Sequence, residues 1–354
     1  MNAEKKIKFR LDPETGTLSE IDAKRYFSTV GAAVFALVLI SQLGEVAVMY
    51  AVATFVPAWL ESGIISNLLS VVTLYGLGFP AFYAILRRLP RDTVQPEKMG
   101  GKSFFGALCV AVAAMMAGNY LSQILILTFE QAMGGSLQNP VEAATSGTAW
   151  WVNLIFVGLL APVMEELVFR KILCDRLLPL GEGYTVVLSA VIFGLAHGNF
   201  YQFFYAFALG LLFALIYVKT GRIRYTVAYH AIINIMGGVL APWLLDRLAP
   251  LLEEAALEHM MELSNAGDIQ ALSELMAPYL VPMVILGAYE IFLIGGSIVG
   301  LVLFFKGKKQ IRLERGLLPP PKKGRVANIF CNVGVAAALT AFVALFLLSL
   351  LPTA

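Results

Sequence analysis

Charged residues are scarce in this 354-residue sequence, at 14% of the total, while hydrophobic residues make up 58%. The mean hydropathy of +0.76 is far above the range of soluble domains. Cysteine and histidine are rare, with three residues of each. The cysteines have no motif spacing, which argues against a disulfide framework or a cysteine zinc site. The first 27 residues are polar, so we expect no cleavable signal peptide.

Long apolar runs, by contrast, recur along the whole sequence, and each is long enough to cross a bilayer. They predict an all-α fold, a polytopic membrane helix bundle of eight or nine transmembrane helices with a cytoplasmic N-terminus. No tandem repeat and no separate soluble domain is visible. The predicted spans are residues 28–57, 64–86, 104–129, 149–178, 184–200, 201–219, 225–246, 278–305 and 327–351.

The distribution of Lys and Arg predicts the orientation, because these residues are retained in cytoplasmic loops. With the N-terminus inside, the cytoplasmic segments contain 25 of the 26 Lys and Arg residues, and only Arg247 lies outside. A wrong number of spans would destroy this alternation. The cytoplasmic segments are 1–27, 87–103, 170–183, 219–224 and 306–326.

The predicted topology divides the chain into five parts. A cytoplasmic N-terminal segment and a group of N-terminal transmembrane helices precede a core that contains the polar motifs described below. This core is followed by an acidic external loop with a surface helix. The C-terminal transmembrane helices come last, with their basic cytoplasmic loop 306–326. The parts are 1–27, 28–147, 148–246, 247–277 and 278–354.

The stretch "APVMEELVFRKIL" at 161–173 places two carboxylates and a guanidinium inside an otherwise apolar helix. An ionised group in the bilayer interior costs several kcal/mol, so it marks a functional site by default. Glu166 and Arg170 are four residues apart and share a helix face. At ~100° per residue, Arg170 lies ~40° from Glu166 but ~140° from Glu165. We therefore expect Arg170 to pair with Glu166, which leaves Glu165 available as a general base.

Two of the three histidines, His197 and His230, fall inside predicted spans. Glu165 and His197 are each 16 residues from position 181 in the turn "PLGEG", which predicts similar depths in the membrane. His230 and Asn234 are four residues apart, so both can address one atom from one helix face. These four side chains are predicted to meet near mid-membrane.

Several protease types are excluded because their motifs are missing: GxSG of rhomboid-type serine proteases, GxGD of aspartyl proteases, and HExxH of site-2 metalloproteases. A Glu and a His can instead activate water by general-base catalysis. A second His and an Asn could stabilise the resulting oxyanion. The same side chains, Glu165, His197 and His230, could alternatively bind zinc. The residues by themselves leave both chemistries open.

Three short motifs together carry a family resemblance. "EELVFR" (165–170), "FGLAH" (193–197) and "HAIIN" (230–234) match the signature EExxxR, FxxxH and HxxxN in order on successive helices. The region 148–245 thus resembles the CPBP intramembrane proteases, also called the Abi group. That group includes the type II CAAX prenyl endopeptidases and bacterial bacteriocin-processing or self-immunity proteins.

The resemblance implies a role for each motif residue. Glu165 and His197 would activate water, and His230 and Asn234 would form the oxyanion hole. It implies supporting roles for Glu166, Arg170 and Phe193. Such a mechanism needs no metal, so we expect no cofactor, with zinc at Glu165, His197 and His230 as the alternative.

The resulting hypothesis is an intramembrane endopeptidase of the bacterial cytoplasmic membrane. It would cut a membrane-associated peptide or small membrane protein in a cavity reached from the cytosolic side, and we expect no nucleic-acid partner. Two further acids in predicted spans, Glu45 and Glu290, are outside the motifs. Because such acids also mark proton-coupled transporters, a transporter is one alternative; a non-catalytic bacteriocin-immunity or scaffolding protein is another. The preferred explanation of both acids is a hydrogen bond to Gln42, Tyr289 or another neighbour.

Overall fold

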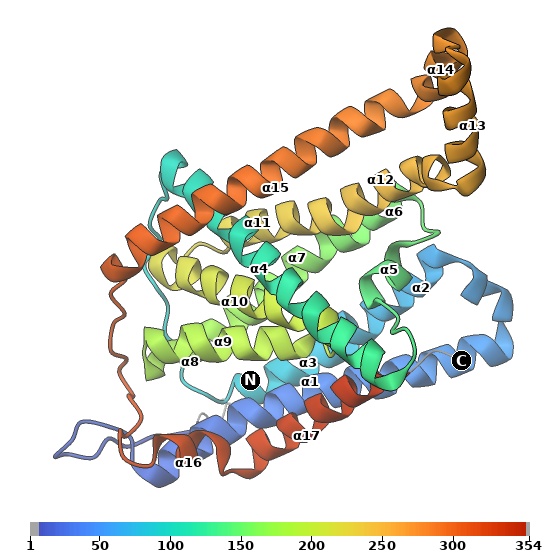
Figure 1. The fold of residues 1–354 in the computed structure, drawn as a ribbon. Coiled ribbons are helices and arrows are strands. Elements are labelled where there is room, and N and C mark those ends of the chain that lie inside the picture. The colour runs from blue at the N-terminus through green and yellow to red at the C-terminus, as the bar shows by residue number, and fades with distance from the viewer. Residues whose placement is uncertain (1–6, 352–354) are drawn as a thin grey trace.

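The computed structural model describes residues 7–351, which form a bundle of long helices (Figure 1). Within these residues, β-structure is limited to two isolated bridges, Leu11 with Leu18 and Gly181 with Arg315. The predicted all-α membrane bundle is confirmed. The protein is an integral membrane protein, because its long apolar helices leave many large hydrophobic side chains exposed.

Among the described residues, seven helical stretches are long and apolar enough to cross a membrane, and each coincides with a predicted span. The other two predicted spans contain shorter apolar helices, α9 (Glu182–Ala196) and α17 (Val333–Leu348). The seven stretches are α1 (Glu20–Phe55), Asn67–Leu86, α4 (Gly101–Met133), Trp150–Leu180, α10 (Phe200–Thr220), Ile223–Leu252 and Ile269–Gln310.

Four of these stretches are composite. The second stretch contains α2 (Gly63–Val71), η2 (Val72–Gly78) and α3 (Phe79–Leu86). The fourth stretch contains α6 (Trp150–Asn153), η3 (Leu154–Leu160), α7 (Ala161–Glu166), η4 (Leu167–Cys174), α8 (Asp175–Leu177) and η5 (Leu178–Leu180). The sixth stretch contains α11 (Ile223–Ile235), η6 (Met236–Leu240), α12 (Ala241–Leu248) and η7 (Ala249–Leu252). The last stretch contains α14 (Ile269–Met276), η8 (Ala277–Tyr279), α15 (Leu280–Gly307) and η9 (Lys308–Gln310). Shorter helices are η1 (Pro57–Glu61), α5 (Pro140–Thr145), α13 (Glu254–Ala266) and α16 (Arg325–Phe330).

Wide π-helical turns interrupt three of the composite helices at prolines. The segments η2, η3 and η6 end two residues before Pro80, Pro162 and Pro242. Proline has no N–H and its ring clashes with the carbonyl four residues earlier, so the turn before it widens. A further π segment, η4, begins directly after Glu166. Glu165 and Glu166 therefore lie in the six-residue helix α7 between two π segments, an irregularity that is frequent at functional sites.

The loops rich in Lys and Arg gather at one end of the bundle, at the left of Figure 1. Backbone hydrogen bonds join them: the N–H groups of Asp92 and Glu97 donate to the carbonyls of Asp175 and Thr220. We call this the basic end and the opposite end the distal end. The basic end consists of residues 7–19, 87–100, 219–224 and 308–324.

A buried carboxylate strengthens the basic end. Asp175 is fully buried and lies 2.8 Å from Arg91 and 3.2 Å from Lys171. The hydroxyl of Tyr217 donates a 2.6 Å hydrogen bond to the same carboxylate.

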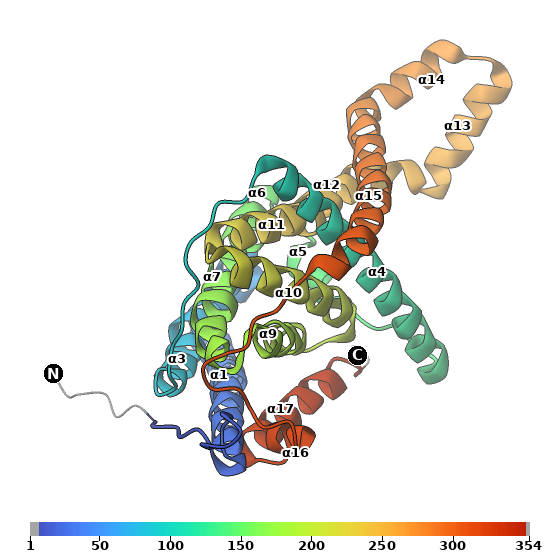
Figure 2. The same cartoon turned by 90° about the vertical axis from the view of Figure 1, so that its left-hand side faces the viewer.

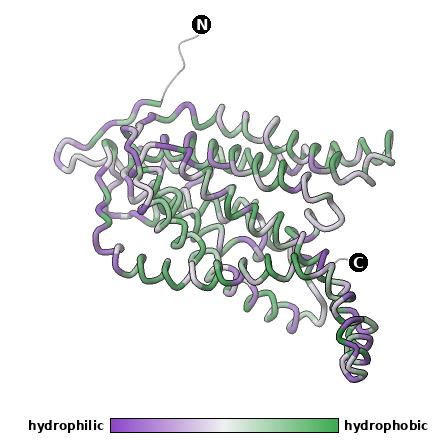
Figure 3. The backbone as a smooth tube through the Cα atoms, turned by 90° about the horizontal axis from the view of Figure 1, so that it is seen from above, coloured by the Kyte–Doolittle hydropathy of each residue, from purple (hydrophilic) through white to green (hydrophobic). Residues whose placement is uncertain are grey.

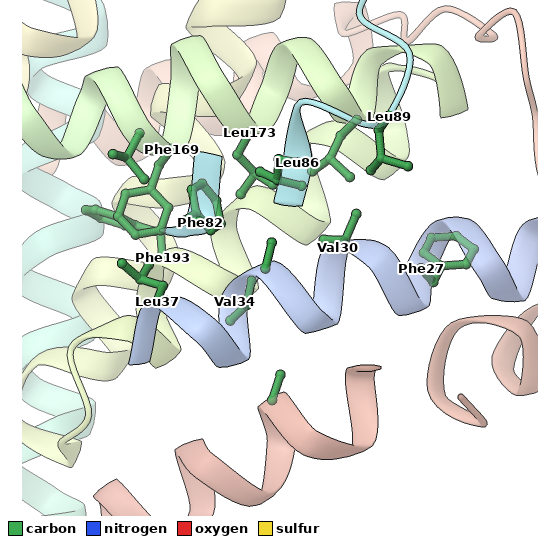
Figure 4. Close-up of a cluster of buried hydrophobic side chains, with 14 of the residues drawn as sticks. Phe27, Val30, Val34, Leu37, Phe82, Leu86, Leu89, Phe169, Leu173 and Phe193 are labelled. Atoms are coloured by element: carbon green, nitrogen blue, oxygen red, sulfur yellow. The ribbon is translucent and has the colours of Figure 1, made fainter. Parts of the chain in front are cut away.

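The half of the bundle next to this end is also filled by hydrophobic side chains. Figure 4 shows part of this core, in which side chains of α1, α3, η4 and α9 meet around Leu86, Leu173 and Phe193.

The distal end is more open. The predicted acidic external loop contains two helices, α13 and α14, and no residue of either is buried. Figure 2 shows that both project away from the rest of the bundle. In Figure 3, hydrophilic residues mark this projection and the loops of the basic end, while the long helices between them are mostly hydrophobic. The sequence predicts one surface helix in this loop, and the structure has two.

Candidate active site

The four residues predicted to meet near mid-membrane line one cavity of about 450 Å³. Glu165 comes from α7, His197 caps the C-terminus of α9, and His230 and Asn234 lie on α11. We call this the catalytic cavity. The convergence from three helices therefore exists in the structure, whereas the role of each residue stays a prediction.

The predicted ion pair between Glu166 and Arg170 is confirmed. Nε of Arg170 lies 3.0 Å from Oε2 of Glu166, and both side chains are completely buried. The guanidinium also donates from Nη1 to Oγ of Ser189 at 2.7 Å, and it lies over the rings of Phe193 and Phe213. Arg170 is thus held by a charge, a hydroxyl and two aromatic faces, an arrangement suited to a planar guanidinium.

Glu165 has a different environment from its neighbour. Its side chain is 20% exposed and faces the catalytic cavity. Within residues 7–351, its Oε2 atom is buried without a hydrogen-bond partner. Nε2 of His230 lies 3.9 Å from this Oε2 atom. A carboxylate oxygen in this setting is available to a water molecule or substrate in the cavity.

The two histidines are held by their Nδ1 atoms. Nδ1 of His197 lies 2.8 Å from the carbonyl of Phe193, and Nδ1 of His230 lies 3.0 Å from Oε1 of Glu166. Because a carbonyl or carboxylate oxygen only accepts, Nδ1 carries the proton in both rings. Nε2 of His197 is consequently a lone-pair acceptor, and Nε2 of His230 faces Glu165.

Phe193 separates the two imidazoles. Its ring meets His197 at 5.0 Å with an interplanar angle of 85°, and His230 at 5.7 Å and 87°. Edge-to-face pairs of this kind restrict ring rotation. Asn234 is also fixed, since its Nδ2 donates to the carbonyl of Val157 at 3.0 Å. One N–H of the Asn234 amide remains for another acceptor.

Several site residues were missed by the sequence reasoning. Ser189 lies one helical turn before Phe193 and two before His197 on the same face, a spacing that could have indicated it. Asn67 and Ser70 on α2 also line the catalytic cavity, as do residues of α10. No motif or spacing relates these helices to α7, so their contribution depended on the tertiary fold.

The two acids outside the motifs differ from each other. Glu45 accepts a 3.0 Å hydrogen bond from Oγ of Ser70, which confirms the expected contact with a neighbouring helix through a partner not foreseen. Glu290 is exposed on α15, and the structure gives it no hydrogen bond among the described residues. The predicted hydrogen bond of Glu290 is therefore wrong.

The side on which the cavity lies also differs from expectation. Leu173 and Leu177 follow Glu165 toward the basic end and are buried in the core, whereas Phe156 and Val157 precede it and line the cavity. The catalytic cavity therefore lies in the distal half of the bundle. The distribution of Lys and Arg predicts that the basic end is cytoplasmic. With that orientation, the position of the cavity does not support the expected access from the cytosolic side.

The zinc alternative can be compared with the same geometry. Glu165, His197 and His230 all face the catalytic cavity and keep one Nε2 or carboxylate oxygen directed into it. However, no group of three or more His, Cys, Asp and Glu side chains in the described part of the chain is close enough together to hold a metal ion. The donor types suit zinc, but their present arrangement does not.

Comparison with known proteins agrees with the motifs. Residues 147–236 match the family model described as "Type II CAAX prenyl endopeptidase Rce1-like". All three motifs lie within this segment. We refer to residues 147–236 as the Rce1-like segment, after the description of the family model that they match.

Two curated bacterial proteins are similar to part of the chain. The identity to "Membrane-embedded CAAX protease MroQ" of Staphylococcus aureus is 33% over 90 residues, which cover 23% of this chain and 36% of the relative. The identity to "Putative membrane peptidase YdiL" of Bacillus subtilis is 26% over 153 residues, which cover 42% of this chain and 62% of the relative. The chain thus spans about a third and three fifths of these relatives. No solved structure gives a significant match.

Proposed function

We propose that this protein is an intramembrane endopeptidase that hydrolyses a peptide bond of a membrane-associated peptide or protein. The observation that carries the proposal is the unpartnered carboxylate oxygen of Glu165 in a cavity that it shares with Nε2 of His197. The names of the two relatives, a CAAX protease and a membrane peptidase, support the same reaction class.

In the proposed reaction, a water molecule lies between Glu165 and His197. Removal of one proton from this water by the Glu165–His197 pair creates the nucleophile, which adds to the carbonyl carbon of the scissile bond. The C=O π bond breaks, and its electron pair becomes the oxyanion. When the oxyanion collapses, the C–N bond breaks, and the proton taken from water passes to the leaving nitrogen. The products are a carboxyl terminus and an amino terminus.

The oxyanion would be stabilised by donors on α11. The second N–H of Asn234 is available without loss of its bond to Val157. His230 can donate from Nε2 only when both ring nitrogens are protonated, because Nδ1 already donates to Glu166. The carboxylates of Glu165 and Glu166, at 3.9 and 3.0 Å, supply the counter-charge for such an imidazolium. Fixed donors of this kind are worth about 10²- to 10³-fold in kcat each.

The proposed mechanism requires no metal. Zinc, if bound by Glu165, His197 and His230, would polarise the carbonyl and acidify water, but the three side chains would first have to draw together. A non-catalytic immunity or scaffolding role would leave the Glu165 carboxylate without a function, and a transporter would need a second set of buried acids along a path. Glu290, exposed on α15, does not supply one.

The test uses the purified full-length protein in detergent as wild type, Glu165→Gln and Glu290→Gln. Each is incubated with peptides that have lipidated or plain C-termini, with and without a strong chelator, and products are identified by mass spectrometry. We expect cleavage by wild type and Glu290→Gln, loss of at least ~10³-fold in Glu165→Gln, and no effect of the chelator. If the chelator abolished cleavage and added zinc restored it, the metal-free mechanism would be overturned. Equal cleavage by Glu165→Gln would overturn the proposal.

A further inference from the structure

A second chamber adjoins the catalytic cavity. It has a volume of about 310 Å³ and shares five lining residues with the catalytic cavity: Ala144, Val157, Gln202, Tyr205 and Asn234. Its other walls come from α4 and α5, which lie outside the Rce1-like segment, and from α10, α11 and η6. Because five carboxamide side chains line it, we call it the amide chamber: Asn119, Gln123, Asn139, Gln202 and Asn234.

Among the described residues, three of these five carboxamides make hydrogen bonds and two make none. Asn139 caps α5, Gln202 bonds to Asn199 and Tyr205, and Asn234 donates to Val157. Within residues 7–351, the structure gives neither Asn119 nor Gln123 a hydrogen bond. They are four residues apart and share one face of α4, an apolar helix long enough to cross a membrane.

Asn119 is half-buried and Gln123 is exposed, and both line the amide chamber. Their donors and acceptors are therefore available to a group that enters the chamber. A peptide main chain in extended form needs hydrogen-bond partners, because each residue presents one N–H and one C=O. The carboxamide group offers both a donor and an acceptor, so it complements a main chain without regard to its side chains.

The charges around the two chambers restrict what can enter. Among the described lining residues, Glu165 and the two histidines are the only ionisable groups apart from tyrosines, and no Lys or Arg is present. A free C-terminal carboxylate is usually bound by Arg, Lys or a set of backbone N–H groups. The chambers therefore favour an uncharged segment that is cut at an internal bond.

We propose that the amide chamber is a substrate-binding subsite that holds the main chain of an extended, uncharged segment next to the scissile bond. The segment enters from the distal end, where both chambers lie. Asn119 and Gln123 are the positioning residues of this subsite. The proposal rests on the proposed function for the reaction, but the binding itself is measurable without cleavage.

The side of entry is tested by cysteine labelling in membrane vesicles. The native Cys331 is exposed near the basic end, Cys174 is buried, and Cys109 is removed as Cys109→Ala. In this background, Gln123→Cys is treated with a membrane-impermeant maleimide in right-side-out and inside-out vesicles. We expect Gln123→Cys to react at least about tenfold faster in right-side-out vesicles and Cys331 to show the opposite preference. Faster labelling of Gln123→Cys in inside-out vesicles would overturn the side of entry.

Binding is tested with three 12-residue probes of Leu, Ala and Ser: one amidated at the C-terminus, one with a free C-terminal carboxylate, and one amidated with two central Lys residues. We expect the amidated neutral probe to slow labelling of Gln123→Cys at least about fivefold and the Lys probe to have no effect. Equal protection by the Lys probe, or protection only by the free-acid probe, would overturn the uncharged, internal-bond specificity. No protection by any probe would overturn the subsite.

The contribution of the carboxamides is tested on any peptide that the wild type cleaves. We expect Asn119→Leu with Gln123→Leu to raise KM about tenfold with kcat nearly unchanged, since two neutral hydrogen bonds to the main chain are lost. The matched control is Gln131→Leu, an exposed carboxamide on the same helix that lines neither chamber. An unchanged KM would overturn the subsite while leaving the protease function intact. Protection of Gln123→Cys without any cleavage would support the subsite and reject the protease function.

Discussion

Glu166 holds Nδ1 of His230 at 3.0 Å while its other carboxylate oxygen carries the ion pair with Arg170. One carboxylate thus joins the helical stretch that contains both glutamates to α11, the helix that carries the predicted oxyanion donors. It also fixes which nitrogen of His230 faces Glu165. The two consecutive glutamates thus differ in their surroundings, because Glu166 is bound within the protein and Glu165 faces the cavity.

This difference predicts unequal effects on stability for two similar variants. Glu166→Gln removes the counter-charge of a completely buried Arg170, and an unpaired buried charge costs about 3–5 kcal/mol. Glu165→Gln removes a carboxylate that has no hydrogen bond through Oε2 and should change stability by less than about 1 kcal/mol. Thermal unfolding in detergent, followed by loss of the monodisperse peak, measures both. A lower midpoint for Glu165→Gln than for Glu166→Gln would contradict this assignment.

Apolar side chains should be able to replace the buried ion pair without loss of stability, but not without loss of activity. Glu166→Leu combined with Arg170→Met exchanges the pair for apolar side chains of similar size, a change that is often neutral or stabilising. We expect the double variant to unfold near the wild-type midpoint, whereas Arg170→Met alone is destabilised. Peptide cleavage should stay at least ~10²-fold below wild type, because His230 loses its Nδ1 partner. Recovery of full cleavage in the double variant would show that Glu166 does not orient His230.

Replacement of Phe193 should lower kcat more than replacement of an ordinary buried apolar side chain. Phe193→Leu keeps an apolar side chain in the core but removes the edge-to-face contacts with His197 and His230. Each such contact is worth about 0.5–1.5 kcal/mol, so we expect kcat to fall roughly 10- to 100-fold. The control is Phe213→Leu, which also lies near Arg170 but contacts only His230 among the two histidines. An equal loss of kcat in both variants would argue against a special role of Phe193.

A glycine of α4 should control the distance between the walls of the amide chamber. A Cβ atom at Gly118 would lie 2.4 Å from the backbone of Tyr205, so α4 must move away from α10 in Gly118→Ala. We expect a loss of about 1–3 kcal/mol in stability and a higher KM, because Asn119 moves with the helix. Gly295→Ala on α15 is the control, since nothing lies within 4 Å of its added methyl group. It should be neutral or slightly stabilising through better helix propensity.

Much of this molecule could be read from local patterns. Nine predicted spans correspond to seven long and two shorter apolar helices, because bilayer thickness imposes a length that hydropathy reports directly. The pair of Glu166 and Arg170 was predictable because its spacing is fixed by a single helix. The separate orientation of Glu165 followed from the same geometry.

Contacts between helices far apart in the sequence were decided by the tertiary structure alone. The bond of Ser189 to Arg170, the amide chamber between α4 and α10, and the position of the catalytic cavity toward the distal end follow from how the helices pack. Hydropathy cannot report them, because an apolar helix offers similar side chains on all faces and its rotation is set by close packing with its neighbours. The sequence by itself determined which helices are long and apolar enough to cross a membrane and which residues are candidates for the chemistry. Only the packing of the helices decided that these candidates meet and on which side of them the cavity lies.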